Sequence, residues 1–370
     1  MDTERRIAEL LNGRRPDRVP VFPFEIRGFG AIDAGKPIAD AYRSATTSYA
    51  IQVRALELYG FDGFPRYSYG AYGGWELGGD IFFPESEWQQ APTVLRHPAS
   101  TEEDLLSIVP PPLRKGGCIP IALAFSRMAQ QDGRSVILPF NGVFTTAANA
   151  SGVTTLCKWT IRRPDLAHKL LRITTDHLKQ VVSLWVSTFG RDIWGWTSEP
   201  SSSNQVISPQ AFEEFVLPYE IELHQWMLSL GIRHIMTHIC GDQNLNLPFW
   251  SKVPMGAPGV ATFGHEVDID TAIEHMGHSC IIAGNIEPAL LQNSTPQEVY
   301  DICVTTIEKG RRAPLGFILM PGCSTPPYTP PDNMRAMLRA AVDAGTYSQD
   351  EKTEDERALN KMPDLRSEPL

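Results

Sequence analysis

Three features are scarce in this 370-residue sequence, and each scarcity excludes a class of protein. Six cysteines are too few and too dispersed to form the disulfide framework of a small secreted domain. No run of about 18 apolar residues occurs, so the sequence predicts no membrane-spanning helix. Basic residues are outnumbered, 33 against 43 acidic ones, and the net charge of −10 argues against a nucleic-acid partner.

The same scarcities indicate the cellular compartment. A chain of this length with few, dispersed cysteines is typical of proteins whose thiols stay reduced. The first six residues, MDTERR, are charged and are typical of the start of a helix rather than of a signal peptide. We therefore expect a cytoplasmic protein.

Short apolar segments alternate with helical patterns along most of the chain. Eight such segments are predicted strands, and the helices between them predict an α/β fold, the (β/α)8 or TIM barrel. One barrel of this type accounts for the length without a second domain. The predicted strands are 19–24, 61–66, 135–140, 192–197, 232–239, 260–263, 280–285 and 316–321.

Other segments complete the predicted domain. Residues 3–12 predict an amphipathic N-terminal helix, and residues 68–100, rich in Gly, Pro and aromatic residues, predict an insertion or lid. We expect residues 1–345 to form one barrel and the charged residues 346–370 to form a loosely ordered tail. Longer helices are predicted over 38–58, 119–132, 162–187, 209–230, 270–277, 296–309 and 331–344.

One His and two Cys stand at the ends of two predicted strands. His238 and Cys240 lie two apart near the end of the segment 232–240, so that their side chains point the same way. Cys323 lies just past the strand 316–321. Three such donors suit a zinc ion that keeps a fourth position for substrate. Packing is the alternative role for an isolated His or Cys.

Further polar and aromatic residues are candidates for the same end of the barrel. Barrel enzymes place their active-site residues at the carboxyl ends of the strands. Four residues fall at or just past the ends of predicted strands: Asn141, Glu199, Glu266 and Asn285. Trp196 and Tyr328, with Trp75 and Trp194, could line a substrate pocket or could instead fill the core.

Several motifs along the chain together resemble one protein family. The resemblance is to the uroporphyrinogen decarboxylase superfamily, and within it to the zinc-dependent methyltransferases of corrinoid methyl-transfer systems. It covers nearly all of the chain up to about residue 345. The motifs are Pro16-Asp-Arg-Val-Pro20, Gly142-Val-Phe-Thr145, Ile207-Ser-Pro209 with Phe215-Val-Leu-Pro218, His238-Ile-Cys-Gly241, Ala283-Gly-Asn-Ile-Glu-Pro288, and Pro321-Gly-Cys323 with Thr329-Pro-Pro-Asp-Asn333.

The decarboxylases themselves match less well. They are similar to one another in an early Arg-Gln-Ala-Gly-Arg-Tyr stretch that grips the carboxylates of a tetrapyrrole. The corresponding place here reads Glu25-Ile-Arg-Gly-Phe-Gly30, with one arginine and an acid. The decarboxylases also need no metal, so decarboxylation is set aside in favour of methyl transfer.

The resemblance implies roles for the candidate residues. It implies Zn2+ on His238, Cys240 and Cys323, and related methionine synthases suggest Glu266 as a further ligand, with His265 as its rival. Glu199 would donate or accept a proton or join the zinc, or else cap a loop or pair with an arginine. Asn141, Asn285, Trp196 and Tyr328 would contact substrate, although Asn285 could instead hold a loop by hydrogen bonds.

The resemblance also implies a reaction and a partner. We expect transfer of a methyl group from a small methylated substrate, an aromatic methyl ether in our first interpretation (O-demethylation), to the cobalt(I) of a corrinoid. The chain has no Asp-x-His-x-x-Gly motif, so the corrinoid (cobalamin) would come from a partner protein. The alternatives are transfer from methylcobalamin to a thiol of the coenzyme M type, and a decarboxylase-like or non-catalytic tetrapyrrole-binding barrel. The sequence does not decide whether the protein forms a homodimer.

Overall fold

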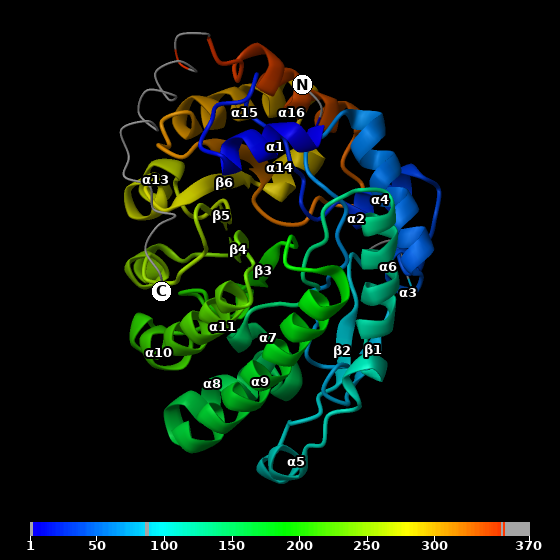
Figure 1. Cartoon of the computed structure of the whole chain (residues 1–370), viewed down its shortest axis with the longest axis vertical. Helices are drawn as coiled ribbons and strands as arrows, with labels where there is room; N and C mark the ends of the chain where they lie inside the picture. Colours follow the sequence, from blue (N-terminus) through cyan, green and yellow to red (C-terminus); the bar gives the residue numbers. More distant parts are fainter. Residues whose placement is uncertain (1–2, 86–88, 349–350, 352–370) are drawn as a thin grey trace.

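The computed structural model describes residues 3–85, 89–348 and 351 of the chain, and a parallel sheet lies at its centre (Figure 1). Five strands are hydrogen-bonded in the order β3-β4-β5-β6-β7. Every residue of these strands is buried except Asn285. The burial arises because helices cover the outer face of the sheet and side chains fill the inner one. The strands are β3 (Gly195–Ser198), β4 (Ile235–Ile239), β5 (Gly259–Phe263), β6 (Cys280–Ile286) and β7 (Phe317–Pro321).

Extended segments continue the sheet beyond both of its edge strands. Val21 forms a parallel bridge with Leu319 of β7, and the Asp62 N–H donates to the Val21 carbonyl over 2.8 Å. Beyond the other edge, Ile137 forms a parallel bridge with Trp194. The predicted α/β barrel is therefore confirmed, with the neighbours in the predicted order.

Three of the eight predicted strands do not form continuous strands. The segments 19–24, 61–66 and 135–140 make isolated bridges or single hydrogen bonds rather than continuous ladders. Proline has no N–H to donate to a ladder, and it occurs in all three segments. The prolines are Pro20, Pro23, Pro65 and Pro139.

Helices surround the sheet, and two of the predicted ones are divided. The predicted helix 38–58 breaks at Ser44, whose hydroxyl accepts a hydrogen bond from the Thr47 N–H and so caps a new helix. The predicted helix 209–230 breaks at Val216, just before Pro218 enters the first turn of a new helix. The helices are α1 (Thr3–Leu11), α2 (Arg27–Asp33), α3 (Asp40–Arg43), α4 (Ala45–Tyr59), α5 (Glu102–Ser107), α6 (Ile119–Gln131), α7 (Val143–Ser151), α8 (Val153–Arg162), α9 (Pro164–Phe189), α10 (Pro209–Phe215), α11 (Leu217–Ser229), α12 (Leu247–Trp250), α13 (Ile269–Met276), α14 (Pro288–Asn293), α15 (Pro296–Gly310) and α16 (Pro331–Asp343).

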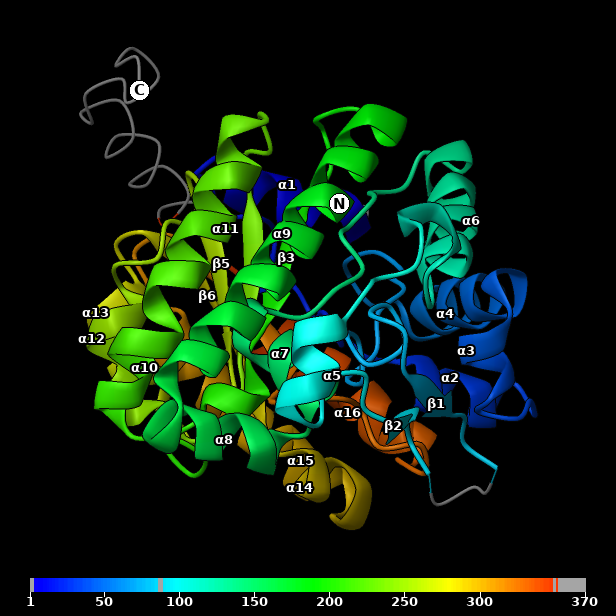
Figure 2. The same cartoon turned by 90° about the horizontal axis from the view of Figure 1, so that it is seen from below.

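The predicted insertion 68–100 packs closely on the barrel. It contains an antiparallel hairpin of β1 (Asp80–Phe82) and β2 (Thr93–Arg96), which lies to one side of the barrel with α2, α3 and α4 (Figure 2). The Asn149 amide on α7 donates to the carbonyls of Gly70 and Tyr72 over 2.7 and 2.9 Å. These bonds attach the insertion to the helix that follows the third barrel segment.

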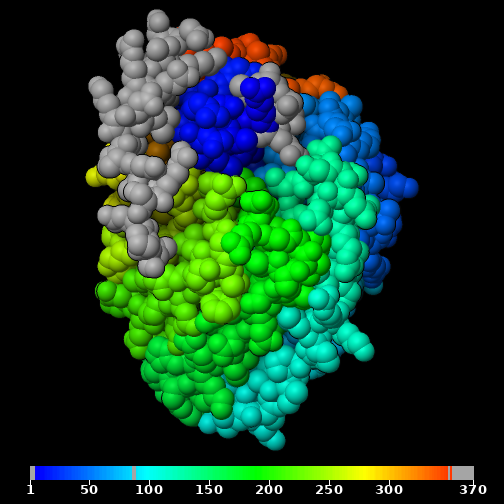
Figure 3. Space-filling model, viewed as in Figure 1, coloured from blue at the N-terminus to red at the C-terminus, as the bar shows by residue number. Residues whose placement is uncertain are grey.

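Helix α1 lies across the amino ends of the strands, and Figure 3 shows it in dark blue on this face of the molecule. Leu10 packs on Gly316, which precedes β7 and whose φ of 101° suits glycine. Tyr347 is buried, and its N–H donates to the Asp17 carbonyl over 3.1 Å. The packed chain thus extends past the predicted boundary at 345, whereas most of the predicted tail lies outside the described residues. None of the described helices is long and apolar enough to cross a membrane.

Candidate metal centre

Two strands bring the three predicted donors together at the carboxyl end of the barrel. His238 lies in β4, Cys240 directly follows β4, and Cys323 lies two residues past β7. The ligand atoms of these three residues all lie within 4.8 Å of one another. Among the described residues, no other group of three or more His, Cys, Asp or Glu meets this criterion.

The spacing of the two sulfur atoms matches the geometry of zinc. Two thiolates bound to one tetrahedral zinc at about 2.3 Å lie about 3.8 Å from each other. The Sγ atoms of Cys240 and Cys323 are 3.8 Å apart. The donor set therefore fits a zinc ion without movement of either cysteine.

His238 presents one ring nitrogen to the sulfurs and uses the other for orientation. Its Nδ1 lies 2.7 Å from the Thr262 hydroxyl on the neighbouring strand β5. Its Nε2 is buried and has no hydrogen-bond partner in the described part of the chain. A metal ligand that is held through its other nitrogen has this arrangement, and Nδ1 then carries the proton.

The two thiols differ in their affinity for a proton. Cys240 and His238 stabilise the thiolate of Cys323, so the pKa of Cys323 lies well below its ordinary value. The adjacent sulfur of Cys323 and burial raise the pKa of Cys240 well above its ordinary value. Binding of a divalent cation to both sulfurs would release the protons that the two thiols hold.

Three glycines allow the loops that carry the donors to approach one another. A Cβ on Gly322 would lie 2.9 Å from the His265 nitrogen, and one on Gly264 would lie 2.9 Å from the Gly241 nitrogen. Gly241 itself has a φ of 77°. Side chains at these positions would push the loops after β4, β5 and β7 apart.

Two buried arginines beside the donors were not among the predicted site residues. The Arg66 guanidinium stacks on the Trp196 ring, 3.5 Å from its centroid. Arg66 and Arg27 both pair with Glu25, at nitrogen–oxygen distances of 3.2 and 2.6 Å. Arg66 ends the predicted strand 61–66, so the strand-end rule that selected the other candidates could have found it.

The sequence matches the family described as uroporphyrinogen decarboxylase (URO-D) over residues 2–343. The chain belongs to this family.

Relatives within the URO-D family are methyltransferases. The methylated-thiol–coenzyme M methyltransferase of Methanosarcina mazei is 29% identical over 62% of this chain, and the match spans 60% of that protein. The methylcobamide:CoM methyltransferase MtaA of Methanosarcina barkeri is 24% identical over 90% of this chain and 96% of its own. A solved methyltransferase from Methanosarcina mazei, 21% identical, has the same fold, with a TM-score of 0.79 over 93% of this chain and 99% of its own. The predicted family is therefore confirmed.

The Glu199 carboxylate lies at the start of α7. Its carboxylate accepts hydrogen bonds from the N–H groups of Phe144 (2.8 Å) and Thr145 (3.0 Å) and from the Thr145 hydroxyl (2.8 Å). Burial and the neighbouring Glu220 raise its pKa well above the ordinary value. These contacts are those of the capping alternative, and the catalytic role stays a prediction.

Glu266 lies outside the cluster of the three donors in the structure. Its carboxylate lies 3.5 Å from the His265 ring nitrogen, and its side chain is partly exposed. It falls outside the group whose ligand atoms are mutually within 4.8 Å. Its negative charge nevertheless contributes to the raised pKa of Cys240, so it lies near the centre. The predicted ligation by Glu266 stays untested.

The two predicted asparagines hold backbone. The Asn285 amide donates to the carbonyls of Gly264 and Val267 over 3.0 and 2.6 Å. The Asn141 amide donates to the Gly70 carbonyl over 2.9 Å and so holds the insertion. The predicted substrate contacts of both residues stay predictions.

The predicted aromatic residues do not share one surface. Trp196 is fully buried beneath Arg66, whereas Tyr328 is 38% exposed. Trp75 packs edge-on against Phe83 in the insertion. Trp194 lies at the opposite, amino end of the barrel, where it packs on Phe64 and His234.

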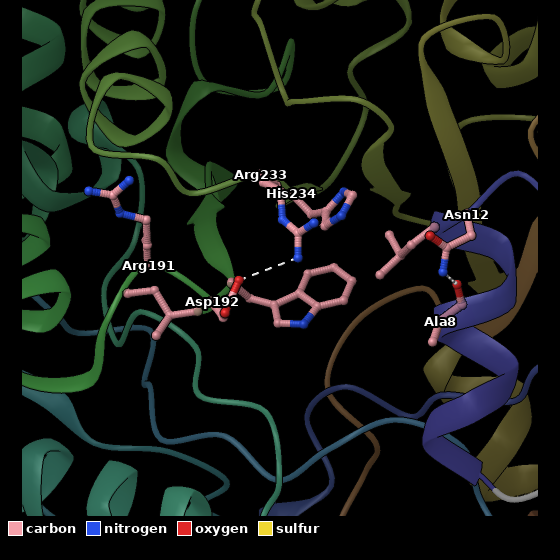
Figure 4. Close-up of a pocket in the computed structure, with 9 residues that line it drawn as sticks. Ala8, Asn12, Arg191, Asp192, Arg233 and His234 are labelled. Atoms are coloured by element: carbon pink, nitrogen blue, oxygen red, sulfur yellow. Dashed lines mark hydrogen bonds and ion pairs between the residues drawn. The ribbon is translucent and has the colours of Figure 1, made fainter. Parts of the chain in front are cut away.

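A separate pocket of about 200 Å³ opens at the amino end of the barrel (Figure 4). Ala8 of α1 and Asn12 directly after this helix form one side, and the segments that precede β3 and β4 form the other. The exposed ion pair of Arg233 and Asp192 spans 3.3 Å there. This pocket faces away from the donors, which lie at the carboxyl ends of the same strands.

Proposed function

We propose that this protein is a zinc-dependent methyltransferase that transfers a methyl group between a small substrate and the corrinoid of a separate protein. The observation that carries the proposal is the cluster of His238, Cys240 and Cys323, whose sulfur spacing matches tetrahedral zinc. A bound zinc would act as a Lewis acid on the oxygen or sulfur of the substrate.

Residues of the chain would balance the charge of the zinc, orient its histidine ligand and exclude water from one side. Two thiolates and one imidazole balance the charge of one divalent cation. The Thr262 hydroxyl holds the His238 ring with Nε2 toward the sulfurs. His238 packs on Phe24, with ring centroids 4.7 Å apart, so one side of the centre is apolar and excludes water.

Two directions of transfer are compatible with these donors. A methyl ether would lose its methyl group to the corrinoid, as in our first interpretation of the sequence. A thiol would instead receive the methyl group from the corrinoid. The relatives are named for transfer to coenzyme M, which is a thiol. Their names support the second direction, so both directions need to be tested.

One optical experiment distinguishes the two directions. The zinc-loaded protein is mixed with a cobalt(I) corrinoid and a panel of methoxy-aromatic compounds, and separately with methylcobalt(III) corrinoid and thiols. Appearance of the methylcobalt(III) absorption in the first mixture supports ether demethylation. Its loss in the second supports transfer to a thiol. Absence of both changes contradicts the proposal.

The variant His238→Ala connects the activity to the metal. We expect it to lose zinc, measured by metal analysis, and to lose methyl transfer with it. Cys157→Ser is the control, because Cys157 lies on α8 outside the donor cluster. A non-catalytic tetrapyrrole-binding barrel would show no turnover in either protein.

A further inference from the structure

A fully buried glutamine contacts the loop that carries Cys240. Gln243 lies on this loop, shortly after β4, and none of its surface reaches solvent. Its side-chain Nε2 lies 3.3 Å from the Glu199 carbonyl oxygen, 3.3 Å from the Cys240 carbonyl oxygen and 3.4 Å from the Ser202 hydroxyl. One side chain therefore connects the loop after β3 with the loop after β4.

The chemistry of its partners fixes the direction in which the Gln243 amide points. The indole N–H of Trp250 and a side-chain N–H of Asn246 donate to the Gln243 oxygen, over 3.2 and 2.8 Å. An indole nitrogen can only donate and a backbone carbonyl can only accept. The oxygen of Gln243 must therefore face Trp250, and its nitrogen must face the two carbonyls. The amide has hydrogen-bond partners at both ends in this orientation alone.

Both metal donors of β4 are connected to Glu199 through backbone groups. The Glu199 N–H donates directly to the His238 carbonyl over 3.1 Å. The Glu199 carbonyl accepts a hydrogen bond from Gln243, which also donates to the Cys240 carbonyl. Glu199 is itself held, because its carboxylate accepts hydrogen bonds from the first N–H groups of α7. The backbones of His238 and Cys240 are thus attached to one fixed residue at the end of β3.

Cys240 depends on this glutamine more than His238 does. His238 lies inside β4 and pairs with both neighbouring strands, whereas Cys240 lies beyond the last residue of the strand. Its carbonyl is held by Gln243 rather than by a strand ladder. A change in the direction of this peptide would move the Cα of Cys240 and its sulfur. That sulfur must stay near its 3.8 Å distance from the Cys323 sulfur if both are to bind one zinc ion.

We propose that Gln243 is a positioning residue of the metal centre. It holds the peptide of Cys240 in the direction that brings the Cys240 sulfur beside Cys323. Partners that orient a metal ligand from outside the coordination shell raise metal affinity. This inference rests on the proposed function, because it concerns a ligand of the same zinc ion.

The variant Gln243→Met tests the proposal through metal binding rather than through methyl transfer. Methionine keeps the approximate length of the side chain but neither donates to the two carbonyls nor accepts from Trp250 as an amide does. We expect zinc to bind at least about tenfold more weakly, the lower end of the effect of an orienting partner, in competition with a chromogenic chelator. The cobalt(II)-substituted protein gives a second readout, because its thiolate-to-cobalt absorption depends on the geometry of the sulfur ligands. We expect this absorption to change as well.

Asn333→Leu is the matched control for the loss of a buried amide. Asn333 is also fully buried, and its side-chain nitrogen donates to the carbonyls of Leu291 (2.7 Å) and Ser294 (2.8 Å). These two residues lie on α14 and directly after it, away from the loops that carry the donors. We expect Asn333→Leu to unfold at a lower urea concentration than wild type. Its zinc affinity and its cobalt absorption should remain those of wild type.

The outcomes distinguish this inference from the proposed function. If either the zinc affinity or the cobalt absorption of Gln243→Met is that of wild type, the positioning role is overturned, even if methyl transfer is observed. Equal losses in Gln243→Met and Asn333→Leu overturn it too. Losses in Gln243→Met alone support it, even if no methyl group reaches a corrinoid. If the wild-type protein binds neither metal, the metal centre and the positioning role both fail.

A measurement on the wild-type protein replaces the variant if Gln243→Met does not fold. If Gln243 favours zinc binding, zinc must equally favour the hydrogen bonds of Gln243, because coupling between two sites is reciprocal. Its side-chain amide, recognised by NMR from its proximity to the Trp250 indole proton, should exchange hydrogen at least about tenfold more slowly with zinc than without. Gln52 is the control, since it is also buried but donates to Ser48. Unchanged exchange at Gln243, or equal slowing at Gln52, overturns the proposal.

Discussion

The sulfur atoms of Cys240 and Cys323 lie 3.8 Å apart, although 83 residues separate them in the chain. The two cysteines follow strands β4 and β7, between which β5 and β6 intervene in the sheet. Curvature of the barrel brings these two strand ends toward a common point. Four predictions follow from this arrangement and from the residues that support it.

Replacement of either cysteine should abolish tight zinc binding. Cys240→Ser and Cys323→Ser each remove a thiolate, and a hydroxyl is a poor substitute ligand for zinc. We expect less than about a tenth of the wild-type affinity, which metal analysis and competition with a chromogenic chelator would measure. Cys303→Ser, in the interior of α15, is the control and should keep its zinc. Unchanged zinc affinity in both site variants would contradict the metal centre.

The Thr262 hydroxyl should contribute to metal affinity without touching the metal. Thr262→Val preserves the shape of the side chain and removes the 2.7 Å contact with His238 Nδ1. Loss of such an orienting partner lowers metal affinity by about 10- to 100-fold. Thr237→Val is a suitable control, because Thr237 is buried in adjacent β4 and contacts Thr197 instead. Equal zinc affinity of the two variants would exclude the orienting role.

Gly322 should be intolerant of even a methyl group. In Gly322→Ala the new Cβ would lie 2.9 Å from the His265 backbone nitrogen, so the loop that carries Cys323 must move. We expect at least about tenfold weaker zinc binding, by analogy with disturbed ligand orientation. Gly70→Ala is the control, since no atom lies within 4 Å of its added Cβ. Unchanged zinc affinity in Gly322→Ala would show that the loop can move without displacing Cys323 from the metal, and would contradict this prediction.

Glu199 should affect stability in a pH-dependent manner. Burial raises its pKa in the folded protein, so protonation favours folding and the stabilising effect declines as pH rises above the ordinary value near 4.5. Glu199→Gln, which cannot ionise, should therefore cost most at low pH and less as pH increases. Urea unfolding at several pH values from about 5 to 9 would measure this trend.

A second carboxylate at a helix start provides the comparison. Glu298 on α15 is exposed, and the N–H and hydroxyl of Thr295 lower its pKa. Its ionised form favours folding, so the cost of Glu298→Gln should shrink as pH falls below the ordinary value near 4.5 and should stay constant from about 5 to 9. If the destabilisation by Glu199→Gln depended on pH in the same way as that by Glu298→Gln, folding would not disfavour the ionised form of Glu199. If Glu199→Gln also retains zinc but loses methyl transfer, the predicted catalytic role is supported.

Much of the architecture could be predicted because it depends on local patterns. The five continuous strands are buried on both faces, and their apolar runs were recognisable in the sequence. The helices were recognisable by their period, but their ends were less so, because Ser44 and Pro218 divide two of them through capping and a missing N–H. The metal donors were recognisable because strand ends meet at one rim of a barrel.

The environment of each side chain could not be predicted in the same way. Glu199 stands at a strand end as expected, but Val143–Ser151 is a helix whose first N–H groups occupy both of its oxygens. The sequence left open whether Trp196 lines a substrate pocket or fills the core, and it gave no sign that Arg66 would cover its ring. These contacts join residues that are distant in the chain, and no local pattern records which partners will meet.

The sequence by itself determined the class of fold, the family and the three donors, because periodicity and motif depend on residues that are close together in the chain. The tertiary structure decided the 3.8 Å spacing of the sulfurs, the orientation of His238 by Thr262, and the meeting of Arg27 and Arg66 at Glu25. Those relationships depend on how β4, β5, β7 and the segments before α4 and after it pack around one rim. The geometry of the donor cluster is a property of that packing, since it requires atoms from several elements within a few ångströms.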